Sequence, residues 1–257
     1  MKTEDKGPET EPANKKRFLV LVDGNPIDLL SIGMLLQKIE YDIYTSNSAE
    51  EALQIISAVL PALVITELTL PGMNGLDFLR RIKQHPATKK IPVIILTSLN
   101  KPDIEKLCVR EGCAAYLRKP FEADTLYREI QNATEPTPRK YIRLRTNLTM
   151  ISGQGTAKES SSVECITDVS ENGMYISTLN PLPVGTVIPV SMVLNKQQVR
   201  IEGVVMYSFS AGHGPLKRPG MGIKFINISP EGKALLRKYI QEQLREGILP
   251  EKGGGTR

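Results

Sequence analysis

The sequence has few of the residues that build zinc sites or disulfide frameworks. Among 257 residues there are three cysteines and two histidines. The cysteines, Cys108, Cys113 and Cys165, form no CxxC pair. This spacing excludes the usual zinc ribbons and fingers. We expect all three to be buried or half-buried thiols in a reducing compartment.

The chain also lacks a long apolar run. No stretch approaches the length of a membrane-spanning helix, and the first residues, MKTEDKGPETEPANKKR, lack the apolar core of a secretory signal. We therefore expect a cytoplasmic protein without a membrane span. With 257 residues, of which 40% are hydrophobic and 24% charged, the chain is long enough for two modest globular domains.

Acidic residues are scarce in the second half of the chain. Residues 1–138 carry 17 basic and 19 acidic side chains, whereas residues 139–257 carry 16 and 9. The second half is therefore basic, which suits a phosphate-bearing partner, although most such charge simply faces solvent.

Short apolar runs alternate with amphipathic stretches from Phe18 onward. The runs are FLVLV, DIYT, ALVIT, IPVIILTS and AAYL, and five helical stretches separate or follow them. Apolar strands joined by helices predict an α/β domain, a doubly wound five-stranded parallel sheet with helices on both faces. We place it at residues 16–133, after a flexible tail at 1–15.

Four polar residues follow four of these strands at their carboxyl ends. They are Asp23, Glu67, Thr97 and Lys119. In sheets of this kind the functional site lies beyond the carboxyl ends of the strands. We therefore expect the fold to bring these four side chains together.

A proline-rich segment, TEPTP at residues 134–138, then interrupts the pattern and predicts an interdomain linker. After it come short strands with turn residues between them, which predict a small antiparallel β-barrel over residues 139–246. The first of these strands is expected at Tyr141–Met150. A helix capped by Ser229 closes the domain, and residues 247–257 are expected to be a flexible tail.

The motifs VDGN, ELTLPGMNG, ILTS and AAYLRKPF occur in this order at the strand ends. Together they resemble the receiver domain of bacterial response regulators. The resemblance implies an acidic pair that holds Mg²⁺, an aspartate that accepts a phosphoryl group, and a hydroxyl and an amine that contact it. These roles fall on Asp23 with Gly24, on Glu67, on Thr97 and on Lys119.

Two of these positions depart from the receiver pattern. Gly24 has no carboxylate, so one magnesium ligand is missing. Glu67 is one methylene longer than aspartate, and a nucleophile misplaced by about 1 Å can lose roughly a hundredfold in rate. We therefore expect a site that is not phosphorylated and does not take Mg²⁺, in which Lys119 pairs with the Glu67 carboxylate.

Glu67 leaves two alternatives open. It could mimic a phosphorylated aspartate, although it supplies about one negative charge where a phosphoryl group supplies closer to two. It could equally form an ordinary ion pair with no signalling consequence. In either case the domain is expected to serve as a docking module for a protein partner or for a homodimer.

The second domain carries RxxxR, from Arg139 to Arg143, and [D/N]xSxxG, formed by Asp168, Ser170 and Gly173. With the closing stretch PGMGIKFINISPEGKALL, these motifs resemble a PilZ domain, the bacterial receptor module for cyclic di-GMP. The resemblance implies that these five residues bind this nucleotide. Since Arg139 directly follows the linker, binding is expected to order the junction and to change how the two domains face each other.

The residue types suit such a ligand. A guanidinium fork can bind a phosphate or the O6/N7 edge of guanine. An aspartate can accept from guanine N–H groups, a serine can donate, and a glycine allows the backbone to approach closely. The same residues could instead be solvated charges at a strand and ordinary turn formers.

We therefore expect a cyclic di-GMP receptor in bacterial signal transduction, with no catalytic activity. The main alternative is an adaptor whose barrel docks a protein without any nucleotide. A DNA-binding protein is not expected, because no helix with reading residues is recognisable.

Overall fold

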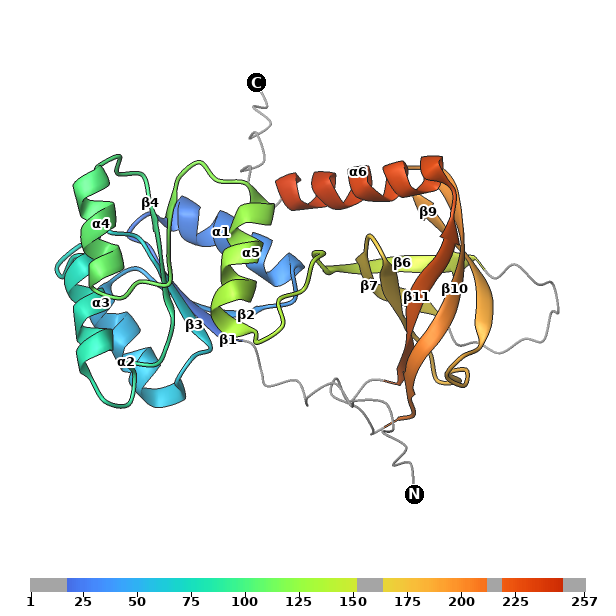
Figure 1. The fold of residues 1–257 in the computed structure, drawn as a ribbon, viewed down its shortest axis with the longest axis horizontal. Coiled ribbons are helices and arrows are strands. Elements are labelled where there is room, and N and C mark those ends of the chain that lie inside the picture. Colours follow the sequence, from blue (N-terminus) through green and yellow to red (C-terminus); the bar gives the residue numbers. More distant parts are fainter. Residues whose placement is uncertain (1–17, 152–163, 212–218, 247–257) are drawn as a thin grey trace, which may run out of the picture.

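The computed structural model describes residues 18–151, 164–211 and 219–246. The predicted tails, 1–15 and 247–257, lie outside this part of the chain. Figure 1 shows two lobes side by side, an α/β lobe formed by the first half of the chain and a β-barrel formed by the second.

The first lobe is a five-stranded parallel sheet with the strand order β2-β1-β3-β4-β5. This confirms the predicted α/β fold. Its strands are β1 (Phe18–Val22), β2 (Asp42–Ser46), β3 (Leu63–Thr66), β4 (Val93–Thr97) and β5 (Ala115–Arg118). Its helices are α1 (Pro26–Lys38), α2 (Ala49–Val59), α3 (Gly75–Gln84), α4 (Pro102–Arg110) and α5 (Ala123–Thr134).

Neighbouring side chains along each strand point to opposite faces of the sheet, so the core of this lobe has two layers. In β1, Leu19 and Leu21 pack with α1 and α5, whereas Val20 and Val22 pack with α2, α3 and Cys108 of α4. Since successive side chains of a strand point to opposite faces, helices cover both faces of the sheet. The strand ends are thereby held rigidly at one edge.

Capping residues mark the first turns of α1, α2 and α3. The Asn25 side chain accepts the amide hydrogen of Ile27 at the start of α1, and Pro26 occupies the first turn. Ser48 and Asn74 cap α2 and α3 in the same way. Such caps satisfy amides that have no partner within the helix.

The second lobe is a closed antiparallel barrel with the order β10-β11-β8-β7-β6-β9, as predicted. Its strands are β6 (Leu144–Ile151), β7 (Cys165–Ser170), β8 (Gly173–Ser177), β9 (Val187–Leu194), β10 (Gln197–Phe209) and β11 (Gly220–Ile228). Helix α6 (Pro230–Glu246) follows the last strand.

The first barrel strand begins three residues later than the predicted Tyr141. Ile142 is buried, and the Tyr141 carbonyl accepts the Tyr127 hydroxyl of α5 at 3.3 Å. This segment therefore packs against the first lobe instead of pairing with a strand. Arg139 and Arg143 consequently lie on the connection between the lobes.

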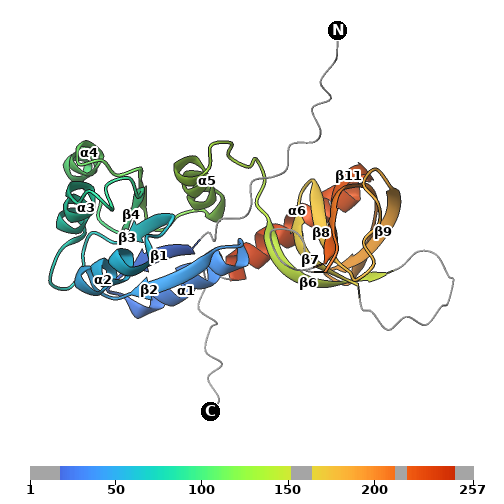
Figure 2. The same ribbon diagram turned by 90° about the horizontal axis from the view of Figure 1, so that it is seen from below.

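The two lobes share one apolar cluster. It joins α1 and α5 to Ile142, Leu144 and the buried face of α6. Figures 1 and 2 show α6 extending from the barrel toward the first lobe, and the Lys38 ammonium donates to the Gln243 carbonyl of α6 at 2.8 Å. The lobes are thus packed together and not merely tethered.

The cysteines have the predicted environments, since Cys108 is buried and Cys113 and Cys165 are half-buried. Within the part of the chain that the structure describes, no helix is long and apolar enough to cross a membrane.

Candidate functional sites

The four polar residues predicted at the strand ends meet at one edge of the sheet. Asp23, Glu67 and Thr97 are buried. The Lys119 ammonium lies 3.2 Å from a Glu67 carboxylate oxygen, and it is closer still to Asp23, at 2.5 Å. The expected contact between Lys119 and Glu67 is therefore present, but it is the longest of the Lys119 ion pairs.

Lys119 has a third partner that the sequence did not suggest. Asp28, in the first turn of α1, lies 2.7 Å from its ammonium nitrogen. Burial alone would lower the pKa of Lys119, but the hydrogen bonds with Asp23 and Asp28, together with the negative charges of Asp23 and Glu67, raise it above its ordinary value. The amine is a cation in contact with three carboxylates.

The Glu67 carboxylate is held from several sides. One oxygen accepts the amide hydrogens of Leu68 at 2.7 Å and Thr69 at 3.2 Å, and it also accepts the Thr97 hydroxyl. The other oxygen faces Lys119 and the Ser98 amide. This side chain is fixed in place by donors, so its oxygens are already engaged.

The acidic pair that would hold Mg²⁺ is incomplete in this geometry. Asp23 uses one oxygen for the Asn25 amide and the other for Lys119. At Gly24 no carboxylate is present, and even a Cβ atom would lie 3.0 Å from the Pro71 ring. Of the acidic pair, this geometry therefore offers only Asp23, and both of its oxygens already have partners.

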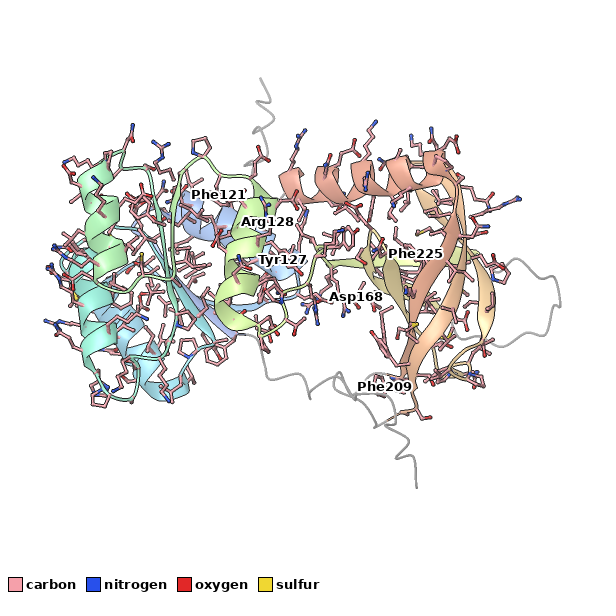
Figure 3. The ribbon with its side chains drawn as sticks, viewed as in Figure 1. Phe121, Tyr127, Arg128, Asp168, Phe209 and Phe225 are labelled. Carbon is pink, nitrogen blue, oxygen red and sulfur yellow. The ribbon has the colours of Figure 1, made fainter. Side chains whose placement is uncertain are left out.

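A second site lies on the barrel, on the side that faces the first lobe. It is a pocket of about 380 Å³. Its lining includes all five residues of the two barrel motifs, namely Arg139, Arg143, Asp168, Ser170 and Gly173. Figure 3 shows Asp168 in the space between the barrel and α5. A larger cavity of about 710 Å³, beside α1 and β2, contains none of the predicted residues.

The [D/N]xSxxG motif forms a tight hairpin between β7 and β8. Ser170 and Gly173 are paired across a two-residue turn, and the Ser170 hydroxyl donates to the Gly173 carbonyl at 3.1 Å. A Cβ atom on Gly173 would lie 2.6 Å from the carbonyl oxygen of Ile223. Gly173 is therefore required by close strand packing, whatever its role toward a ligand.

The junction between the lobes is already held in this structure. The Arg139 amide donates to the side-chain oxygen of Gln131 at 3.1 Å, and its guanidinium lies 3.2 Å from the Glu40 carboxylate. Gln131 is buried and donates to the Tyr41 hydroxyl at 2.8 Å. These contacts pack the Arg139 end of the linker against the first lobe.

The pocket also has members that the motifs did not indicate. Tyr175 and Tyr207 line it, with ring centroids 6.4 Å apart in a stacked arrangement. A Cβ atom on Gly222 would lie 2.2 Å from the Tyr207 ring, so this glycine lets the ring lie against the strand. Aromatic faces of this kind can stack on bases.

Glu40 is the most unexpected member, because it belongs to the first lobe. No sequence signal marks it, since its proximity to Arg139 depends on how the two lobes pack.

The parallel α/β lobe with its cluster of acids and a lysine, joined to a closed barrel, is the architecture of a two-domain signalling protein. The model for the response regulator receiver domain matches residues 19–131, and the model for the PilZ domain matches residues 137–242. The chain therefore contains a receiver domain followed by a PilZ domain, which confirms both resemblances.

Three similar proteins match the receiver domain of this chain. The two-component response regulator ORR3 of Oryza sativa subsp. indica is 32% identical over 122 residues, which are 47% of this chain and 89% of that protein. Protein PilH of Pseudomonas aeruginosa is 25% identical over 112 residues, 44% of this chain and 93% of PilH. A response regulator from Chloroflexus aurantiacus, known from a crystal structure, is 32% identical in sequence to this chain. The two structures align with a TM-score of 0.45 over 47% of this chain and 98% of the Chloroflexus chain.

Proposed function

We propose that the protein is a bacterial cyclic di-GMP receptor whose PilZ pocket binds the nucleotide. The observation that supports this most directly is that two motifs separated in the sequence, RxxxR and [D/N]xSxxG, line one pocket. Pairing of β6 with β7 places Arg145 opposite Asp168, and the pocket at this edge gathers both motif arginines with the residues of the hairpin.

The pocket offers what the nucleotide requires. Arg139 and Arg143 supply guanidinium forks for phosphodiester oxygens or a guanine edge. Asp168 supplies an acceptor for guanine N–H groups, and Lys224 adds a further cation on the pocket wall. The tyrosines supply faces for stacking.

For the receiver domain we propose a role without phosphorylation or Mg²⁺. Lys119 forms ion pairs with three carboxylates. The Glu67 carboxylate accepts hydrogen bonds from the Thr97 hydroxyl and backbone amides and pairs with Lys119. Such a site has one stable arrangement. The domain then serves for docking a protein partner or for forming a homodimer.

Receiver and PilZ domains are non-catalytic domain types, and we propose that the protein acts as a receptor in the cytoplasm and not as an enzyme. The alternative is an adaptor that docks a protein through the barrel without nucleotide. It does not explain why the arginines and Asp168 share a pocket.

Calorimetric titration of the full chain with cyclic di-GMP tests this proposal. Arg143→Ala and Asp168→Ala should each weaken binding by about 2 kcal/mol, roughly 30-fold, because each removes a charged hydrogen-bond partner of the ligand. Arg200→Ala is the matched control, because Arg200 is an exposed arginine of β10 that does not line the pocket.

Wild-type affinity in the Arg200→Ala variant, with weakened binding in the other two, supports the site. Equal affinity in all four proteins would place the nucleotide elsewhere. No heat of binding in the wild type would favour the adaptor.

A further inference from the structure

The receiver domain contributes one charged side chain to the nucleotide pocket of the barrel. Glu40 lies in the turn between α1 and β2 and lines the pocket together with Arg139, Arg143 and Asp168. Its carboxylate oxygen is 3.2 Å from a terminal nitrogen of Arg139. An acid of the first domain thus pairs with the first arginine of the RxxxR motif.

Packed elements hold this turn in position. The Tyr41 amide donates to the Leu36 carbonyl at 3.1 Å, and the Tyr41 hydroxyl accepts a hydrogen bond from Gln131. On the other side, Lys38 donates to the α6 carbonyl of Gln243. Glu40 is therefore presented to the barrel by contacts on both sides of the turn.

The backbone at Glu40 is also unusual. Its φ is +72°, in the left-handed region that costs a residue with a side chain roughly 1 kcal/mol or more. A glycine or asparagine would adopt this turn more easily. The side chain is held here at a conformational cost, and in the pocket it pairs with Arg139 and forms a hydrogen bond with Asp168.

Burial, together with the negative charge of Asp168, raises the pKa of Glu40 to about 7, although Arg143 and Arg139 act in the opposite direction. Near neutral pH the side chain therefore exchanges between a carboxylate and a neutral acid. Only the carboxylate can form an ion pair with Arg139.

We propose that Glu40 is an intramolecular competitor of the nucleotide, because its carboxylate occupies the face of Arg139 that a phosphodiester would take. This rests on the proposed function of the pocket. When the nucleotide binds, Arg139 exchanges Glu40 for a phosphate, and one contact between receiver and barrel is lost. Because coupling is reciprocal, the factor by which the Glu40–Arg139 contact weakens nucleotide binding is also the factor by which the nucleotide weakens that contact.

One other role for Glu40 predicts the opposite sign. As a second acceptor beside Asp168, Glu40 could receive the N–H groups of a guanine. Removing its charge would then weaken binding, whereas removing a competitor strengthens it. A single substitution separates the two roles.

The test is titration of the full chain with cyclic di-GMP at pH 8 and pH 6. At pH 8, Glu40→Gln and Glu40→Ala should bind about 3- to 10-fold more tightly than the wild type, as expected for loss of a half-buried ion pair. Glu105→Gln is the matched control, since Glu105 is an exposed acid of α4 in the same domain. Its affinity should equal that of the wild type.

The pH dependence has a defined sign. The ionised form competes, so wild-type affinity should fall as the pH rises through about 7, and this fall should be smaller in Glu40→Gln. The other charged or titratable groups on the pocket are Arg139, Lys140, Arg143, Lys224, Asp168, Tyr141, Tyr175 and Tyr207.

Equal or weaker binding by both Glu40 variants at pH 8 would overturn the proposal while leaving the nucleotide site intact. If neither the wild type nor any variant binds cyclic di-GMP at either pH, the proposed function is wrong, and the proposed competition by Glu40 is wrong with it.

Discussion

At the scale of single residues, Lys119 decides the state of the receiver site. Its ammonium lies within 3.2 Å of three carboxylates, those of Asp23 after β1, Asp28 in α1 and Glu67 after β3. The Thr97 hydroxyl and three backbone amides, of Leu68, Thr69 and Ser98, also donate to the Glu67 carboxylate. Lys119 and Thr97, the groups that would contact an incoming phosphoryl group, both have the Glu67 carboxylate as a partner in this structure.

Acetyl phosphate with Mg²⁺ is therefore expected to leave the protein unmodified. Glu67 is too long to place its oxygen as an aspartate would, and Gly24 brings no ligand for the metal. Intact-mass measurement after incubation checks this. A mass increase of one phosphoryl group, sensitive to hydroxylamine, would contradict it.

The Glu67→Asp variant serves as the matched control for this experiment. It restores the shorter acid but leaves Gly24 unchanged. Continued absence of the adduct would show that the missing carboxylate at position 24 is sufficient to block the reaction. An adduct in this variant alone would assign the block to the length of Glu67.

At the scale of elements, the barrel depends on close approach of its strands at glycines. Gly173 begins β8 and is paired with Lys224 of β11. The Ile223 carbonyl oxygen would lie 2.6 Å from an added Cβ atom. Since that oxygen belongs to a paired strand, it cannot move without separating β8 from β11.

Gly173→Ala is expected to destabilise the protein by about 1 to 3 kcal/mol, the usual range for an overpacked site. Gly33→Ala is its control, because a Cβ atom there would meet only the Thr45 methyl group at 3.9 Å. In the middle of α1 that change should stabilise by about 0.5 to 1 kcal/mol. Urea unfolding followed by circular dichroism measures both, and an unchanged or higher stability of Gly173→Ala would contradict the packing account.

The strand ends were predictable from the sequence, whereas the partners of the strand-end residues were only partly so. Asp23, Glu67, Thr97 and Lys119 follow parallel strands, and such strands end at one edge. Asp28 was missed because its contact with Lys119 depends on the rotation of α1. The late start of β6 was missed because Ile142 packs against the first lobe, a tertiary contact that outweighs its strand-like pattern.

At the scale of the whole molecule, the nucleotide pocket lies where the two domains meet. The apolar cluster runs from the receiver helices into the barrel, and Glu40 reaches Arg139 across the same boundary. Nothing in a single sequence places position 40 beside position 139, because this pairing follows from domain packing. A ligand in this pocket would therefore contact residues of both domains.

Hydrogen exchange with and without saturating cyclic di-GMP tests this account most directly. Amides at residues 139–145 and 168–173 should exchange more slowly, because the ligand covers both motifs. The Tyr41 amide should exchange faster, since release of Glu40 from Arg139 loosens the turn whose hydrogen bond to Leu36 protects it. Unchanged exchange in both barrel segments would contradict the nucleotide site, and protection there without any change at Tyr41 would contradict its coupling to the receiver.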